Sequence, residues 1–327
     1  MKILTSLAFA AALSAAAVPG AAGARDAAAF PSRPVTLVVP FTPSSGSDII
    51  ARIIAPKLEA RWGQPVIVVN KPGASGDIGA RQVAVAAPDG YTLLMAINSF
   101  TMTPSLHRNL PFDPVRGFAP VAKLATAGYT FAINPKVPAH DMKSLIAYVK
   151  TQGGHVNYAT PGTGTPQHLA MELFKSHLGL HIAHVPYKGI AGALTGLVGG
   201  EVQMMFTTVH TMLPFLKDKR VRLLAVTGEQ RDALIPDVPT FREQGIDFMD
   251  GVDAWYGVMA PASTPPAIVE GLNRDFVAVM NASQVKAQLA ELGLSVHTSS
   301  AAEFSSLIKH DLARWKKVVD TAGIQAQ

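Results

Sequence analysis

Two short loops that combine hydroxyl side chains with glycine are the parts of this sequence best suited to hold a small anion. Residues 42–47 read TPSSGS, and residues 160–165 read TPGTGT. Each loop follows a short apolar run and leads into an amphipathic segment. The start of a helix presents unpaired N–H groups and partial positive charge, and glycine lets the backbone approach a ligand closely. We therefore expect the two loops to grip a carboxylate; the plainer alternative is that Ser47 and Thr165 are ordinary helix caps.

Three histidines, His177, His181 and His184, have a spacing that suggests a metal site. However, Gly179 interrupts the helix between the first two, and the last two would point to opposite faces of a strand. The segment 73–79, GASGDIG, departs from the dinucleotide-binding pattern and lacks the final glycine of a serine-hydrolase elbow. We therefore predict structural or surface histidines, no metal site and no cofactor.

The acidic residues Asp48, Asp77 and Asp253 are the remaining candidates for a general acid or base. Asp48 and Asp77 each stand where a helix is expected to begin, and a carboxylate stabilises that end of a helix. Asp253 is expected to hold a hinge or to orient a donor. We therefore predict no catalytic residue and a protein that is not an enzyme. The alternative function is a secreted hydrolase or lyase acting on a small organic acid.

The elements that must position these loops form a repeated unit of apolar run, polar loop and amphipathic segment, which is typical of parallel βα units. Residues 35–39 are nearly all β-branched or apolar, as in a strand covered on both faces. Pro56 is expected to kink or split the helix that follows. A second series begins near Phe131 and includes a helix over 166–178. We expect the chain to end in two helices, the last opened by a capping box at residues 300–303.

The composition indicates an exported chain with two α/β lobes. Residues 1–24 have the cation, the apolar run and the small residues of a cleavable signal peptide. The chain contains no cysteine, which excludes disulfides and thiolate metal sites. The net charge of +5 comes without a basic cluster interleaved with aromatics, so we predict no nucleic-acid partner. The predicted domains are residues 25–131 with 255–327 as lobe one and 132–254 as lobe two, and we expect a monomer.

Eight motifs, in this order and spacing, resemble the Bug-family receptors, which are the extracytoplasmic solute-binding components of tripartite tricarboxylate transporters. Three of them are GQPVIVVNKPGASGDIGA, YATPGTGTPQHLAMELF and WYGVMAPASTP. The resemblance implies a type II periplasmic-binding-protein fold, with mixed, mostly parallel sheets and the ligand between two lobes. It also implies a periplasmic protein that captures a small carboxylate for the membrane permease subunits of such a transporter.

Carried over by position, the resemblance places the ligand loops at residues 41–48 and 159–165. The family usually has Ala-Gly-Gly-Gly-Thr-Asp where this chain has PSSGSD at residues 43–48, so hydroxyls replace hydrogens at two flexible positions. This departure indicates an altered ligand preference. The predicted ligand-binding residues are Phe41, Thr42, Ser44, Ser45, Gly46, Ser47, Asp48, Asn98, Ser99, Thr160, Gly162, Thr163, Gly164, Thr165, Tyr187, Thr207 and Asp253.

Overall fold

The computed structural model describes residues 30–43, 45–107, 109–228 and 230–324. The predicted signal peptide at residues 1–24 and the predicted site residue Ser44 lie outside these described residues. Within them, no helix combines the length and the apolar character needed to cross a membrane.

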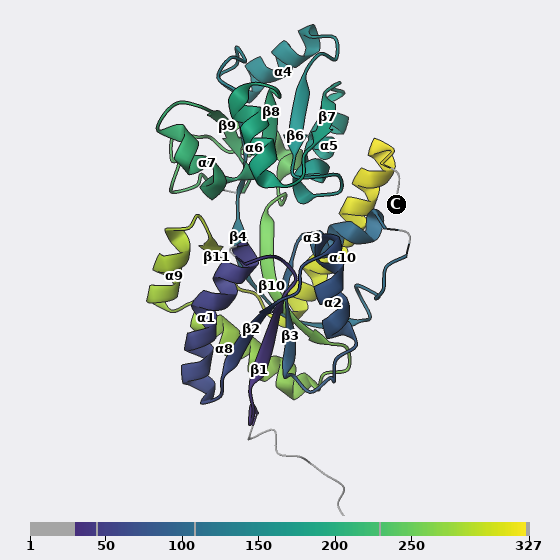
Figure 1. The fold of residues 1–327 in the computed structure, drawn as a ribbon, viewed down its shortest axis with the longest axis vertical. Coiled ribbons are helices and arrows are strands. Elements are labelled where there is room, and N and C mark those ends of the chain that lie inside the picture. The colour runs from purple at the N-terminus through teal and green to yellow at the C-terminus, as the bar shows by residue number, and fades with distance from the viewer. Residues whose placement is uncertain (1–29, 44, 108, 229, 325–327) are drawn as a thin grey trace, which may run out of the picture. The chain divides into compact units, whose positions relative to one another are not determined.

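One part of the fold is a mixed six-stranded sheet (Figure 1). Its strands are β1 (Val35–Val39), β2 (Val66–Asn70), β3 (Thr92–Ile97), β4 (Phe118–Ala127), β10 (Ala254–Pro261) and β11 (Ser295–Val296). Their order across the sheet is β11-β4-β10-β3-β1-β2. β1 runs parallel to β2 and β3, whereas β10 runs antiparallel to β3 and β4. The carboxyl ends of β1, β2 and β3 therefore share one edge of the sheet.

Helices cover this first sheet. They are α1 (Gly46–Trp62), α2 (Asp77–Ala84), α3 (Ser99–Met102), α8 (Pro266–Met280), α9 (Ser283–Ala290) and α10 (Ala301–Ala322), with single turns η2 (Ala74–Gly76) and η3 (Thr103–Ser105). Successive side chains of a strand point to opposite faces. Val38 of β1 accordingly packs with Ala80 of α2 and Phe304 of α10, which leaves its neighbours Leu37 and Val39 facing the other side.

Two expectations about these helices need correction. α1 continues through Pro56 as one helix, so the proline does not split it, while the expected kink stays a prediction. A proline removes one N–H donor but leaves the other hydrogen bonds of a helix of 17 residues in place. The chain also ends in three helices rather than two, because the backbone turns at Asn281 and Ala282, between α8 and α9.

The second sheet has five strands in the order β7-β6-β8-β5-β9. They are β5 (Tyr129–Ile133), β6 (Asn157–Thr160), β7 (Ala183–Pro186), β8 (Met204–Thr208) and β9 (Arg222–Val226). The helices of this part are α4 (Met142–Thr151), α5 (Pro166–Leu178), α6 (Ile190–Gly199) and α7 (Val209–Leu216), with turns η4 (Arg242–Gln244) and η5 (Asp247–Met249). The predicted helix over 166–178 is confirmed. The core around the second sheet includes a cluster of four aromatic rings, those of Phe131, Phe174, Phe206 and Phe241.

The two sheets are mixed, as expected, but they are not mostly parallel. The nine pairings between described strands comprise four parallel and five antiparallel ones. Sheet membership changes between β4 and β5 and returns to the first sheet at β10. The first change falls at Gly128, a few residues before the predicted boundary between residues 131 and 132. The assignment of these two parts to lobes remains a prediction.

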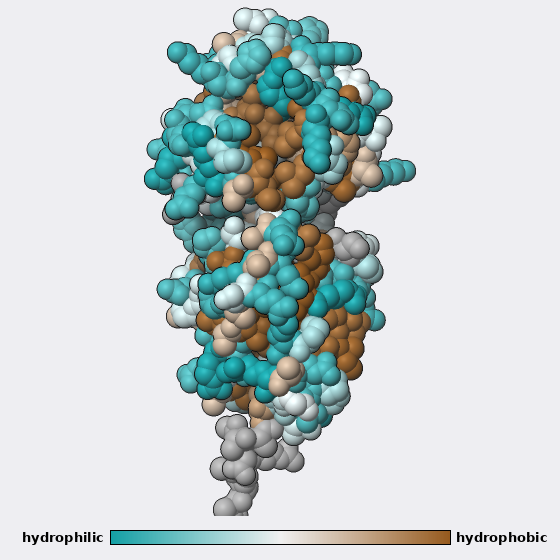
Figure 2. All heavy atoms as spheres, turned by 90° about the vertical axis from the view of Figure 1, so that its left-hand side faces the viewer, coloured by the Kyte–Doolittle hydropathy of each residue, from teal (hydrophilic) through white to brown (hydrophobic). Residues whose placement is uncertain are grey.

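Part of the surface over the second sheet is apolar. Figure 2 looks onto the side that carries α7 and α9 and shows apolar residues surrounded by polar ones over this part of the chain. α6 contains no charged residue, and Ile190 at its start is 36% exposed. Leu194, Leu213 and Phe215 are only partly buried against the core of this part. The outer surface of α6 and α7, the helices that cover this side of the second sheet, is therefore only partly polar.

Candidate functional site

The first predicted loop joins β1 to α1 and leaves backbone donors free. Ser45 is the N-cap of α1, and its hydroxyl accepts a hydrogen bond from the N–H of Asp48 at 3.4 Å. The Ser45 N–H donates to the carbonyl of Thr42. Among the described residues, none accepts from the N–H groups of Gly46 or Ser47. The residue that caps the helix is thus Ser45 rather than Ser47, and two amide donors at the helix start remain available to an anion.

Asp48 holds the first loop in place. Both of its carboxylate oxygens accept from Nε of Arg52 at 3.0 Å, and Oδ1 also accepts from Nδ2 of Asn70 at 2.8 Å. The same Asn70 amide donates to the carbonyl of Phe41 at 3.0 Å. The Asp48 side chain is only 3% exposed. Its charge is therefore already compensated, and its role in this geometry is to fix the loop, while contact with a ligand remains a prediction.

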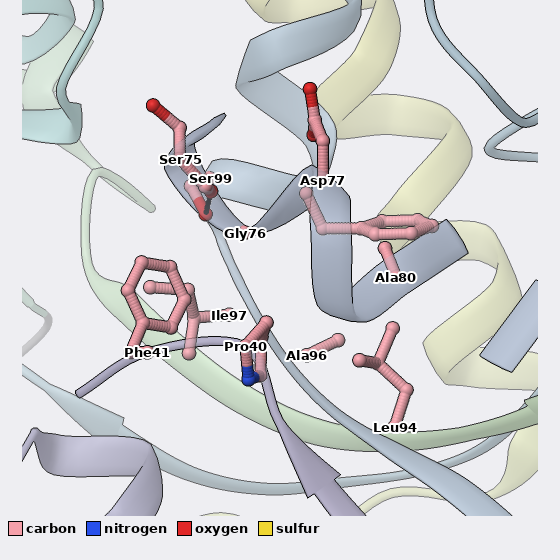
Figure 3. A pocket seen from close by; sticks show the side chains of 11 residues that line it. Pro40, Phe41, Ser75, Gly76, Asp77, Ala80, Leu94, Ala96, Ile97 and Ser99 are labelled. Carbon is pink, nitrogen blue, oxygen red and sulfur yellow. Dashed lines mark hydrogen bonds between the residues drawn. The ribbon is translucent and has the colours of Figure 1, made fainter. Parts of the chain in front are cut away.

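A small pocket lies beside this loop at the carboxyl ends of the parallel strands (Figure 3). Its cavity volume is about 10 Å³, room for about one water molecule, and the predicted site residues Phe41 and Ser99 both line it. The Ser99 hydroxyl donates to the carbonyl of Ser75 at 3.1 Å. Ala74 and Ser75 have φ values of 46° and 55°, a left-handed conformation that non-glycine residues rarely adopt. The loop after β2 thus stores backbone strain next to the pocket.

The second predicted loop, between β6 and α5, is folded on itself. The carbonyl of Gly162 accepts from the hydroxyl of Thr160 at 3.0 Å and from the hydroxyl of Thr165 at 2.8 Å. Gly164 has a φ of +77°, a left-handed conformation that favours glycine, and a Cβ on it would lie 2.9 Å from Cδ1 of Leu106. Thr163 is exposed, and no described residue pairs with its N–H or its hydroxyl. Thr163 is therefore the free donor of this loop.

Two stacked histidines hold the second loop through hydrogen bonds. The rings of His168 and His184 lie 4.0 Å apart, and the ring of Tyr158 stacks on His184 at 4.9 Å. Nδ1 of His168 accepts from the N–H of Gly164 at 3.1 Å, and Nε2 of His184 is hydrogen-bonded to the hydroxyl of Thr160 at 2.7 Å. Burial and the facing His168 lower the pKa of His184 to about 4, and burial also lowers the pKa of His168. Both rings are therefore neutral at neutral pH.

The remaining predicted residues are Asn98 at the end of β3, Asp253 just before β10, and Thr207 on β8. Asn98, at the end of β3, donates from Nδ2 to the hydroxyl of Tyr129 at 3.3 Å, and its Oδ1 is buried with no partner in the described part of the chain. Asp253 accepts from the hydroxyl of Thr227 at 2.5 Å, and burial raises its pKa. Thr207 is buried, and its hydroxyl has no partner among the described residues. Asn98 and Thr207 thus carry polar atoms that a ligand or water would satisfy.

Tyr187 is engaged elsewhere. Its ring lies over α6, where Gly192 and Gly196 leave room for it, and its hydroxyl donates to Glu201 at 3.3 Å. Its backbone N–H donates to the carbonyl of Thr160, so it braces the second loop through the main chain. A contact between the Tyr187 ring and a ligand remains a prediction.

Three residues that hold the two loops through side-chain hydrogen bonds were missed from the sequence. Asn70 ends β2, His168 lies on α5 and His184 on β7, and each bonds a loop from a neighbouring element. Tyr256 of β10 packs against Gly46 at the start of α1. Polar residues at the ends of strands were a usable signal for Asn70, but the position of Tyr256 depends on an antiparallel pairing far along the chain. Among the described residues, no three His, Asp or Glu side chains are arranged to hold a metal ion.

The fold places this chain in the class of α/β solute-binding proteins. A protein of R. palustris solved with adipate is 33% identical to it with a TM-score of 0.79, covering 90% of this chain and 99% of that one. MatC from Rhodopseudomonas palustris, solved with bound malate, is 32% identical with a TM-score of 0.74, covering 89% of this chain and all of that one (100%). The type II periplasmic-binding-protein fold predicted from the sequence is confirmed.

The family follows from the sequence comparisons. The model of the tripartite tricarboxylate transporter family receptor, TctC, matches residues 50–324. Protein BugT of Bordetella pertussis is 32% identical over 310 residues, which are 94% of this chain and 94% of that protein. The chain belongs to the TctC receptor family, and the resemblance to Bug-family receptors is confirmed.

Proposed function

We propose that this protein is a periplasmic receptor that captures a small carboxylate and delivers it to the membrane permease subunits of a tripartite tricarboxylate transporter. The observation that carries the proposal is the pair of loops that keep backbone donors free. Gly46 and Ser47 offer two N–H groups at the start of a 17-residue helix, and Thr163 offers an N–H and a hydroxyl on the other loop. Relatives of the same family were solved with adipate and with malate, both of which are dicarboxylates.

Charge compensation in the loops supports recognition by neutral donors. The guanidinium of Arg52 is bonded to Asp48, and the charge of Lys175 is bonded to Glu172. The charges of Arg52 and Lys175 are thus already paired within the protein. A carboxylate bound there is held by amide and hydroxyl groups, which also suits ligands that differ in the atoms between their carboxylates.

The proposal is tested by calorimetry of the purified mature protein against a panel of mono-, di- and tricarboxylates and acidic amino acids. We expect at least one carboxylate to bind tightly; no binding across the panel would refute the proposal. In the same assay, Ser45→Ala and Thr163→Val are each expected to weaken binding by about 1–3 kcal/mol. Unchanged affinity in both variants would refute the assignment of these two loops.

Ser45→Ala also removes a helix cap, so it needs a matched control. Ser300 caps α10 in the same way, with its hydroxyl accepting from the N–H of Glu303 at 3.2 Å. Ser300→Ala is expected to lower the stability of the protein by about 1 kcal/mol without changing affinity. A comparable loss of affinity in both serine variants would assign the effect of Ser45 to stability instead of ligand contact.

The absence of turnover is tested separately. The bound acid is incubated with the protein and then identified by mass spectrometry. We expect it to be recovered unchanged. A product formed in proportion to protein concentration would favour the hydrolase or lyase alternative.

A further inference from the structure

Tyr256 presents to the start of α1 a hydroxyl that has no partner among the described residues. The residue lies on β10 and is only 6% exposed. A Cβ placed on Gly46 would lie 2.9 Å from Cζ and 3.0 Å from Cε1 of Tyr256, and closer still to its hydroxyl oxygen. Among the described residues, none forms a hydrogen bond with that hydroxyl. A tyrosine hydroxyl without a partner in the protein is free to bond to a ligand or to water.

The other tyrosines near the two loops differ in this respect. The hydroxyl of Tyr129 accepts from Asn98, and the hydroxyl of Tyr187 donates to Glu201. Burial raises the pKa of Tyr256 to about 12, so its hydroxyl keeps its proton at neutral pH and is available as a donor. The N–H groups of Gly46 and Ser47 are free at the same helix start. Three donors without acceptors therefore lie together on the first loop.

We infer that the hydroxyl of Tyr256 and the N–H groups of Gly46 and Ser47 together bind one carboxylate of the ligand. Tyr256 is thus a ligand-binding residue, supplied by β10 to a loop that lies far from it in the sequence. The inference also explains the residue type at position 46, because any side chain there would occupy the place of the phenol. It rests on the proposed carboxylate-binding function.

The test compares Tyr256→Phe with the wild-type protein by calorimetry, using adipate, malate and the tightest-binding acid of the panel. The variant keeps the ring and removes one hydrogen bond to a charged group, so Kd is expected to rise about 10- to 100-fold. The midpoint of thermal unfolding without ligand is expected to stay the same, since the hydroxyl has no partner in the protein. Tyr91→Phe is the control, because Tyr91 lies just before β3, at the opposite end of the parallel strands.

A second measurement reports on ligand binding by the wild-type protein itself. Wild-type protein labelled with ¹³C at the ζ carbon of tyrosine is titrated with the same acid, and the signal of Tyr256 is assigned by its absence in Tyr256→Phe. A ligand that accepts from the phenol is expected to shift this signal.

The outcomes separate the two claims. Loss of affinity in Tyr256→Phe, together with the shift of the Tyr256 signal, would support the inference. Tight binding by the wild type, with equal affinity in Tyr256→Phe or an unmoved Tyr256 signal, would overturn this inference and leave the carboxylate receptor intact. No binding of any acid by the wild type would overturn both.

Discussion

The stability of this protein is expected to fall in mild acid because His184 is held neutral under the second loop. Burial and the stacked ring of His168 lower the pKa of His184 from 6.5 to about 4. This difference in pKa corresponds to a contribution of at most about 3 kcal/mol to the free energy of unfolding. Because the ring is partly exposed, we expect a contribution of about 2 kcal/mol. In the unfolded chain His184 takes up its proton near pH 6.5, whereas in the folded protein it does so only near pH 4. The contribution is therefore fully present above pH 6.5 and is lost as the pH falls towards 4.

The perturbation that tests this reasoning is His184→Gln. Glutamine keeps a polar group that can bond to the hydroxyl of Thr160 but has no titrating proton. Urea unfolding is followed at pH 7.5, 6.5, 5.5 and 4.5 for the wild type and the variant. Between pH 6.5 and pH 4.5, the free energy of unfolding is expected to fall less steeply with pH in the variant than in the wild type. The two slopes should differ by up to about 1.4 kcal/mol per pH unit in the middle of this pH range.

His181→Gln is the matched control, because His181 is exposed on the segment that leads into β7. It is expected to retain the pH dependence of the wild type. The reasoning is refuted if His184→Gln and the wild type lose stability in parallel over this range. A parallel loss would mean that burial of the histidine stack does not set the acid sensitivity of the protein.

Two further predictions concern the first loop. Gly46→Ala is expected to destabilise the protein by about 1–3 kcal/mol, because the added Cβ would clash with the buried ring of Tyr256. Gly199, at the end of α6, is the control position, since a Cβ there would meet nothing within 4 Å. Gly199→Ala should therefore be neutral or stabilising in the same urea assay. Asn70→Ala removes the donor to the carbonyl of Phe41 and is expected to raise Kd for the bound acid about 3- to 10-fold by calorimetry, with equal affinity contradicting the role of this amide.

Local chemistry explains why many elements were predictable. Thr165 and Pro166 open α5, and Gly179 ends it with a φ of 61°, so start and stop signals bracket the helix. The capping box of Ser300 and Glu303 likewise marks the start of α10. These signals act within one turn of the chain. They therefore appear in the sequence whatever the rest of the fold does.

Long-range pairing explains what the sequence analysis missed. β4 and β10 pair antiparallel although more than a hundred residues separate them, and no local pattern records that contact. The same holds for the site. The loop residues were recognisable from their hydroxyls and glycines, but Asn70 and His168 reach the loops from other elements. The contact between Tyr256 and Gly46 depends on where β10 lies in the first sheet, which no local pattern predicts.

The two loops share a design in which side chains fix the backbone and leave its donors unused. Asp48 and Asn70 hold the first loop, and His168 and Thr160 hold the second, so each loop is bonded from behind. The free N–H groups are thus in position before a ligand arrives, which reduces the entropy lost on binding. Because the donors address the carboxylate alone, the rest of the ligand is left to be selected by the shape and polarity of its surroundings. Substitutions of residues that line the space beyond the loops should therefore change which acid is preferred. Substitutions of residues that hold the two loops should instead lower the affinity for all acids alike.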